Sequence, residues 1–205
     1  MRKIFVYLFL ASFLLFQSSV FAASFRDMNV SHWAYKYVIT LTNNNVINGY
    51  NDGTFRPEGT ITNAEFIKLV VMAALPEWID INDAESNFEH WASRYVWIAE
   101  RYGLIKTGSI TLENIDIPIT RIEMVRIIVK ADLTMKGNSL ATSEKVKFKD
   151  VISLNSDDLL LLKHACSKNL ITGYTDNTFR PQSNMTRAEA ATIIYRFKWG
   201  EVYDK

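Results

Sequence analysis

The protein has 205 residues, of which 23 are basic and 22 acidic, and its formal net charge is +1 at pH 7. A chain with this balance lacks the basic stripe with which proteins displace counterions from DNA or RNA, so we expect no nucleic-acid partner. Hydrophobic residues make up 48% of the chain and Cys166 is its one cysteine, so stability must come from an apolar core without an intramolecular disulfide.

The N-terminal residues have the order of a secretory signal peptide. Arg2 and Lys3 precede an apolar run from Ile4 to Phe16, and small residues follow it. Polar residues end this run too early for a membrane helix, which needs about 18 apolar residues in succession. We expect cleavage after Ala22, with Ala23 as the alternative, and no membrane span in the mature protein.

The remaining sequence contains three copies of one unit. The pair His32-Trp33 recurs 58 residues later as His90-Trp91, and the loop GYNDGTFRP, which starts at Gly49, recurs 124 residues later as GYTDNTFRP. Each copy reads as a first helix with one apolar stripe, a loop of turn residues and a second helix. One unit cannot bury its stripe alone, so we expect a mostly all-α fold in which three helix-loop-helix units pack around a pseudo-threefold axis.

The apolar stripe of the first helix is carried in the first unit by Ala34, Val38 and Leu41, at i, i+4 and i+7. Leu162 holds the matching place in the third unit. The expected segments, in chain order, are the signal peptide 1–22, the first repeat 24–75, the second repeat 78–133, a polar linker 134–147, the third repeat 148–197 and a tail 198–205.

The second helix of every unit begins with the same signal. Thr62, Thr120 and Thr186 are each followed three residues later by a glutamate, which is the pattern of a reciprocal capping box. Arg121 and Arg187 come directly after two of these threonines, where a cation opposes the helix macrodipole. Open backbone N–H groups and a guanidinium there would form an anion site for a carboxylate or phosphate. The alternative is that both arginines are solvated or pair with an acid of a neighbouring unit.

The units resemble S-layer homology repeats of bacterial surface proteins. The resemblance extends from Phe25 to Phe197 and rests on the FRDM and HWA segments, the two GY loops and the elements ITNAE, ITRIE and MTRAE. It implies a mostly helical spindle with three prongs and a central three-helix bundle. Grooves between its units would hold anionic secondary cell-wall polysaccharide, often with pyruvate ketals. The family's ligand-contacting arginine corresponds to Arg187, which we rank first, and to Arg121, which we rank second.

Each unit departs from the family pattern at one place. The first has Asn63 in place of the arginine, so we expect its groove to hold an anionic sugar weakly. The second reads KTGSITLENIDIP where the GY loop belongs, and the third lacks the His-Trp pair. Whether the first groove and the altered loop of the second unit still bind is left open by the sequence.

Six further side chains are candidate ligand contacts. Two tryptophans could stack on sugar faces, although aromatic residues at helical spacing usually pack in cores, and we expect core packing first. Two tyrosines lie beside the loop turns, where a groove role and a structural role are both open. Two arginines before proline could assist anion binding, with solvation or a structural ion pair as the alternative. They are Trp33, Trp91, Tyr50, Tyr174, Arg56 and Arg180.

We expect no metal, no cofactor and no catalytic activity. His32 and His90 hold equivalent positions, which favours a shared structural role over a shared metal site. The Asp-Gly pair at Asp52 lacks the spaced carboxylates of a calcium loop. Cys166 and His164 are two apart on one helix and do not face each other, so they form no nucleophile and base pair.

The leading hypothesis is therefore a secreted protein of the cell wall or cell-envelope surface that attaches noncovalently to anionic wall polysaccharide. One alternative is a scaffold for other envelope proteins whose grooves no longer bind glycan. Another is a wall-modifying enzyme. Repeats of this family usually tether a larger domain, and the sequence ends soon after Phe197. We therefore expect a free-standing envelope component or a cargo that is a separate protein.

Overall fold

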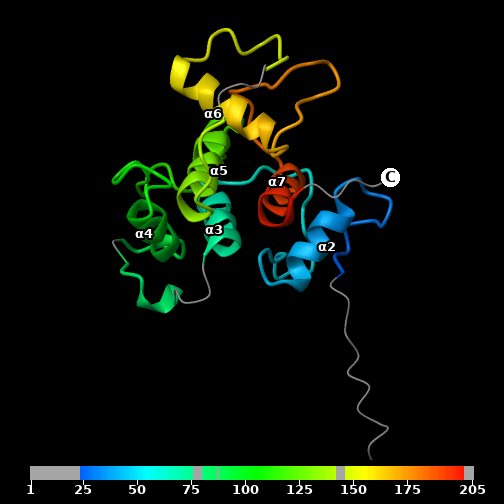
Figure 1. Cartoon of the computed structure of the whole chain (residues 1–205). Coiled ribbons are helices and arrows are strands. Elements are labelled where there is room, and N and C mark those ends of the chain that lie inside the picture. Colours follow the sequence, from blue (N-terminus) through cyan, green and yellow to red (C-terminus); the bar gives the residue numbers. More distant parts are fainter. Residues whose placement is uncertain (1–23, 76–79, 87, 142–145, 201–205) are drawn as a thin grey trace, which may run out of the picture.

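The computed structural model describes residues 24–75, 80–86, 88–141 and 146–200 (Figure 1). These residues form six α-helices and one short 3-10 helix, with no strand among them, and the mostly all-α expectation is confirmed. The expected signal peptide lies outside the described residues. The elements are α2 (Tyr35–Asn43), α3 (Asn63–Ala74), η2 (Ile81–Asp83), α4 (Ser93–Arg101), α5 (Arg121–Met135), α6 (Ser156–Ser167) and α7 (Arg187–Trp199).

The second helices α3, α5 and α7 begin at the predicted capping boxes. In α3 the Thr62 side chain accepts the N–H of Glu65, and the Glu65 carboxylate accepts the N–H of Thr62. The same reciprocal pair is present at the start of α5 and of α7. Because a capping box satisfies two backbone N–H groups that have no partner within the helix, it fixes where each of these helices starts.

The first helix of each unit packs against a second helix from another unit. The pairs are α4 on α3, α6 on α5 and α2 on α7, and α3 also contacts both α5 and α7. Figure 1 shows α3, α5 and α7 in the middle of the molecule, with α2, α4 and α6 outside them. The predicted stripe makes these contacts, since Val38, Leu41 and Leu162 are fully buried. Burial between units thus supplies the core that one unit lacks.

A closed ring of backbone hydrogen bonds joins the three units just before their second helices. The N–H of Ile61 donates to the carbonyl of Met185 at 3.0 Å, that of Met185 to Ile119 at 3.1 Å, and that of Ile119 back to Ile61 at 3.0 Å. All three side chains are fully buried. Because each bond joins a different pair of units and the third bond closes the ring, each unit is in contact with the other two, as the expected packing of three units around one axis requires.

A buried histidine and aspartate join α6 to α5 and to the start of the polar stretch that follows α5. His164 Nε2 lies 2.9 Å from Asp132 Oδ2, and His164 Nδ1 accepts the N–H of Ala141 at 2.9 Å. Asn138 bonds to Asp132 through its side chain at 3.0 Å. The predicted linker is therefore attached to the helices at Asn138 and Ala141, and α5 itself continues to Met135.

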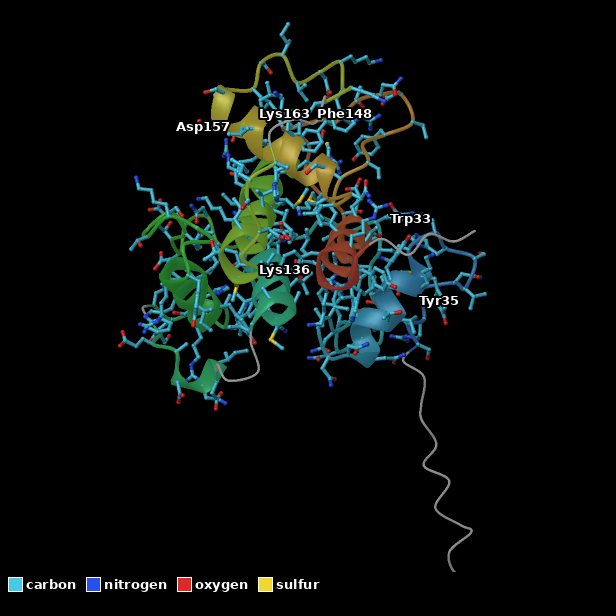
Figure 2. The ribbon with its side chains drawn as sticks, in the orientation of Figure 1. Trp33, Tyr35, Lys136, Phe148, Asp157 and Lys163 are labelled. Atoms are coloured by element: carbon cyan, nitrogen blue, oxygen red, sulfur yellow. The ribbon has the colours of Figure 1, made fainter. Side chains whose placement is uncertain are left out.

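Two lysines donate hydrogen bonds to carbonyl groups near the C-terminal ends of the second helices. Lys136, labelled in Figure 2, donates from Nζ to the carbonyl of Phe197 near the end of α7. Lys198 donates to the carbonyl of Ala73 near the end of α3 at 3.1 Å. Burial lowers the pKa of the Lys136 ammonium group. Cations at helix C-termini are favourable because the last carbonyl groups carry partial negative charge.

Candidate functional site

Three pockets lie at related places in the units, each beside the capping glutamate of a second helix. Pocket A lies beside Glu65, pocket B beside Glu123 and pocket C beside Glu189, with volumes of about 150, 520 and 540 Å³. Each pocket lies at a junction, because the residue that begins the second helix of another unit completes its wall. These residues are Arg187 in pocket A, Asn63 in pocket B and Arg121 in pocket C.

Arg187 lines pocket A and is only 4% exposed. Its Nη1 donates to Glu65 Oε1 at 2.8 Å. Its Nε and Nη2 donate to the carbonyl groups of Phe55 and Asn48 at 2.8 and 3.2 Å. The Tyr50 hydroxyl donates to the same Glu65 oxygen at 3.0 Å, and its ring centre lies 4.6 Å from the Arg187 guanidinium carbon. These three side chains form what we call the Arg–Glu–Tyr cluster.

Pocket C contains a second Arg–Glu–Tyr cluster, with looser contacts. Arg121 is 5% exposed and donates from Nε to the carbonyl of Phe179 at 2.7 Å. Its Nη1 lies 3.3 Å from Glu189 Oε1, which also accepts the Tyr174 hydroxyl at 2.6 Å. Arg121 Nη2 makes no hydrogen bond within the described residues, whereas the Nη2 of Arg187 does. Arg121 therefore keeps a donor that a ligand in pocket C could use.

The expected accessible anion site at the helix starts is wrong in two respects. Both guanidinium groups are buried and paired with a glutamate of a neighbouring unit, which is the alternative weighed from the sequence. The backbone N–H groups are also occupied, since that of Arg187 donates to Gly59 at 2.8 Å and that of Arg121 to Ser183 at 3.0 Å. Both arginines nevertheless line pockets, so a ligand-contacting role for them stays a prediction.

The outer face of each cluster tyrosine is covered by an exposed arginine. The Arg56 guanidinium carbon lies 3.9 Å from the Tyr50 ring centre, and that of Arg180 lies 4.1 Å from the Tyr174 ring centre. Each arginine also pairs with the aspartate four residues before it, at 2.9 and 3.0 Å. Burial raises the pKa of both tyrosine hydroxyls, so each remains a donor to its glutamate at neutral pH. Arg56 and Arg180 lie outside the lining of the three pockets and have structural ion pairs.

The two tryptophans are on the surface, and the expectation that they pack in the core is wrong. Trp91 is 54% exposed and lines pocket A, while Trp33 is 56% exposed and lines pocket C. Figure 2 shows Trp33 next to the start of α2. Each tryptophan comes from a different unit than the glutamate of its pocket. Pockets A and C therefore each combine an exposed indole with a buried Arg–Glu–Tyr cluster.

The histidines that precede these tryptophans have structural contacts. His32 Nδ1 accepts the N–H of Ala34 at 3.1 Å, and its Nε2 lies 3.2 Å from Glu58. His90 repeats both contacts, with Nε2 3.3 Å from Asp116. The shared structural role predicted for them is therefore present. Among the described residues no group of three or more histidine, cysteine, aspartate or glutamate side chains could hold a metal ion.

Pocket B has neither an Arg–Glu–Tyr cluster nor a tryptophan. The Asn63 side chain, at the place of the arginine, donates to the Asn114 carbonyl at 3.0 Å. Gly108 stands where the repeat register places the tyrosine, and Asp157 where it places the tryptophan. Asp157 lies at the outer end of α6 (Figure 2). Of these three residues only Asn63 lines pocket B, and the places of the tyrosine and the tryptophan are assigned to this pocket by the repeat register.

Basic residues that were not predicted from the sequence line the pockets one and two helical turns after the capping glutamates. They are Lys68 in pocket A, Arg126 and Lys130 in pocket B, and Arg196 in pocket C. Arg196 Nε is buried and has no hydrogen-bond partner among the described residues. The i+3 and i+7 spacing from each glutamate places them on the same face of the helix, and this spacing could have identified them.

Comparison with known proteins agrees with the repeat pattern. The family model described as "S-layer homology domain" matches residues 24–67 and 165–191. An endoglucanase of Bacillus sp. (strain KSM-635) is 25% identical over 180 residues, which cover 87% of this chain and 19% of that protein. A cellulosome-anchoring protein of Acetivibrio thermocellus is 31% identical over 159 residues, which cover 73% of this chain and 34% of that protein.

An S-layer protein of Bacillus thuringiensis subsp. finitimus is 28% identical over 180 residues, which cover 83% of this chain and 21% of that protein. The chain thus spans about a third or less of the length of these relatives. The activity named for the endoglucanase is therefore not assigned to this chain. None of the helices in the described part of the chain has the length and apolar character needed to cross a membrane.

Proposed function

Because residues 24–67 and 165–191 belong to the S-layer homology domain family, we propose that this protein is a secreted component of the cell envelope that binds anionic wall polysaccharide noncovalently. The binding sites are pockets A and C. The observation that carries the proposal is the pair of tryptophans, each more than half exposed, at the two pockets that keep a buried Arg–Glu–Tyr cluster.

The two parts of each pocket suit different parts of an acidic sugar. An exposed indole offers a flat apolar face for the C–H face of a sugar ring, and its N–H stays free to bind a hydroxyl group. The cluster offers fixed donors and acceptors, since its guanidinium, carboxylate and phenol hold one another in place. Lys68 in pocket A and Arg196 in pocket C supply the positive charge for an acidic substituent, such as a pyruvate ketal.

Pocket C is the stronger of the two sites, which reverses the order expected from the sequence. Its volume is about 540 Å³ against about 150 Å³ for pocket A. Arg121 also holds its glutamate at 3.3 Å and keeps Nη2 free, whereas Arg187 uses all three of its donor atoms within the described protein. A ligand group can therefore reach an unused donor in pocket C at a smaller energetic cost.

The test compares tryptophan variants of the mature protein in sedimentation with isolated wall polysaccharide. Trp33→Ala alters pocket C and Trp91→Ala alters pocket A. Trp199→Ala is the matched control, because Trp199 is 42% exposed and lies outside the three pockets. Losing one stacking face costs on the order of 1 to 2 kcal/mol, so we expect Trp33→Ala to weaken binding by about tenfold and the control to leave it unchanged.

Two further arms separate the alternatives. Removing the acidic substituents from the polysaccharide should weaken binding of the unaltered protein, because Lys68 and Arg196 would then face a neutral ligand. A double Trp33→Ala, Trp91→Ala variant that folds and still sediments with the polysaccharide as the unaltered protein does would overturn the proposal. Recovery of other envelope proteins without any sugar would instead favour a scaffold.

A further inference from the structure

By the repeat register, the three departures correspond to the arginine, tyrosine and tryptophan positions of pocket B, and of the three residues present there Asn63 lines the pocket. Asn63 belongs to the first unit, Gly108 to the second and Asp157 to the third. The residue after Asp157, Asp158, binds Arg126 of the pocket through two contacts of 2.7 Å. The lining of pocket B thus lacks the arginine of the helix start, the tyrosine and the tryptophan that line the other two pockets, so this pocket has a chemistry of its own.

Replacement of the cluster leaves one carboxylate oxygen of pocket B without a partner. Glu123 Oε2 accepts the backbone N–H of Thr120 at 3.0 Å and its hydroxyl at 2.6 Å. Oε1 has no hydrogen-bond partner within the described residues. In pockets A and C the corresponding oxygen accepts both a tyrosine hydroxyl and a guanidinium group. Glu123 lines pocket B, so this oxygen is an acceptor for a donor group of a ligand.

Pocket B also has more positive charge than the other two pockets. Lys106, Arg126 and Lys130 line it, whereas pocket A has one accessible basic side chain beyond its cluster, and so does pocket C. The charge of Arg126 is balanced by Asp158. Lys106 and Lys130 have no ion pair with a described acid. Two ammonium groups therefore remain for an anionic ligand, and they lie in a pocket of about 520 Å³.

The geometry points to a phosphate group carried by a polyol or sugar as the ligand of pocket B. Lysine ammonium groups act as mobile point charges, and two of them without an acid partner can share the several oxygens of one phosphate. Glu123 Oε1 then accepts a hydroxyl group next to the phosphate. The missing tryptophan removes the flat wall that holds a sugar ring in pockets A and C. Pocket B is thus a second kind of site, independent of the proposed polysaccharide sites.

The test is a nuclear magnetic resonance titration of the mature protein with three probes, namely inorganic phosphate, glycerol 3-phosphate and glycerol. We expect glycerol 3-phosphate to shift the amide signals of Lys106, Gly108 and Glu123, and glycerol to shift none of them. A short phosphodiester oligomer of glycerol phosphate forms a further arm. Tighter binding of the oligomer identifies a polymer as the source of the phosphate, and tighter binding of the monomer identifies a free metabolite.

Charge-matched variants locate the site. Lys106→Gln with Lys130→Gln should weaken glycerol 3-phosphate binding at least tenfold. The control is Lys147→Gln with Lys149→Gln, which removes the same charge from two exposed lysines outside the three pockets and should change the affinity less than twofold. Equal losses in both double variants, or no loss in the first, would overturn the assignment.

Glu123→Gln tests the hydroxyl acceptor. Glutamine at this position keeps the capping pattern, so the helix start is preserved. We expect the variant to lose several-fold in affinity for glycerol 3-phosphate and to gain or keep affinity for inorganic phosphate, which has no neighbouring hydroxyl. Weaker binding of both probes would contradict this role. The Trp33→Ala, Trp91→Ala variant should bind glycerol 3-phosphate normally, so failure of the polysaccharide proposal and failure of this one can be told apart.

Discussion

Arg187 is the residue whose structural role can be measured most directly. Arg187→Met keeps the apolar stem and removes the guanidinium group, so Glu65 Oε1 retains only the Tyr50 hydroxyl as a partner. Breaking a buried ion pair from one side costs about 3 to 5 kcal/mol. The Glu65 side chain is 21% exposed, so water can replace part of the lost contact. We therefore expect a loss of about 2 to 3 kcal/mol in the free energy of unfolding.

A double-mutant cycle measures the pair itself. Glu65→Gln retains the capping pattern, and the cycle combines it with Arg187→Met in urea unfolding experiments on the mature protein. We expect a coupling free energy of about 1.5 to 2.5 kcal/mol, within the range for side chains in direct contact. The control cycle uses Arg180 and Asp176, an exposed pair that should show much weaker coupling.

Equal coupling in the two cycles would contradict a structural role for the buried pair, because that pair would then contribute no more than an exposed one. If the coupling is large, loss of polysaccharide binding in an Arg187 variant cannot be attributed to a lost ligand contact without a stability measurement. This is why the binding test above rests on the tryptophans and on a control of the same residue type.

Three further predictions concern stability. The bidentate contact with Arg126 holds the pKa of Asp158 below its usual range. The ionised Asp158 therefore stabilises the folded protein above the unfolded-state pKa of about 3.9. This stabilisation is lost as the pH falls through the lower pKa of the folded state. The Asp158→Asn variant should therefore have a lower free energy of unfolding in urea than the unaltered protein at pH 6.5, and this difference should shrink below about pH 4. A difference in the free energy of unfolding that stays constant with pH would contradict this. His164→Leu leaves a buried carboxylate without its main partner and should cost about 3 to 5 kcal/mol by the same measurement, whereas a loss below about 1 kcal/mol would mean that the pair adds little. Gly173→Ala combines a positive φ of 70° with a Cβ that would overlap the Phe148 ring, while Gly103→Ala has a φ of 69° and open space. Gly173→Ala should lower the melting temperature well beyond Gly103→Ala, and equal shifts would show that the ring moves aside.

The sequence predicts the local structure of this protein well because the relevant signals are short-range. A capping box involves residues three apart, and its signal at Thr62, Thr120 and Thr186 is visible without knowing the fold. The apolar stripe of the first helix likewise needs only helical spacing. Packing between units follows from the need of each unit to bury that stripe against another unit.

The pockets could not be predicted in the same way because their parts come from different units. Arg187 and Glu65 are far apart in the sequence, and nothing in either segment shows that they form an ion pair. The exposure of Trp33 could not be predicted either, because the spacing of this residue fits a buried helix face as well as an exposed one. That Asn63 lines the same pocket as Lys106 and Lys130 became visible only when the packing order of the units was known.

The ring of three hydrogen bonds around Ile61, Ile119 and Met185 distinguishes this protein from open repeat arrays. A solenoid can gain or lose a unit and change only its length. Here the first unit is also the neighbour of the last, because α2 packs against α7. A fourth unit would find no unoccupied helix face to pack against. A chain with two units would leave two of these faces exposed. Three is therefore the number at which this architecture is complete, and its units are expected to fold and unfold together.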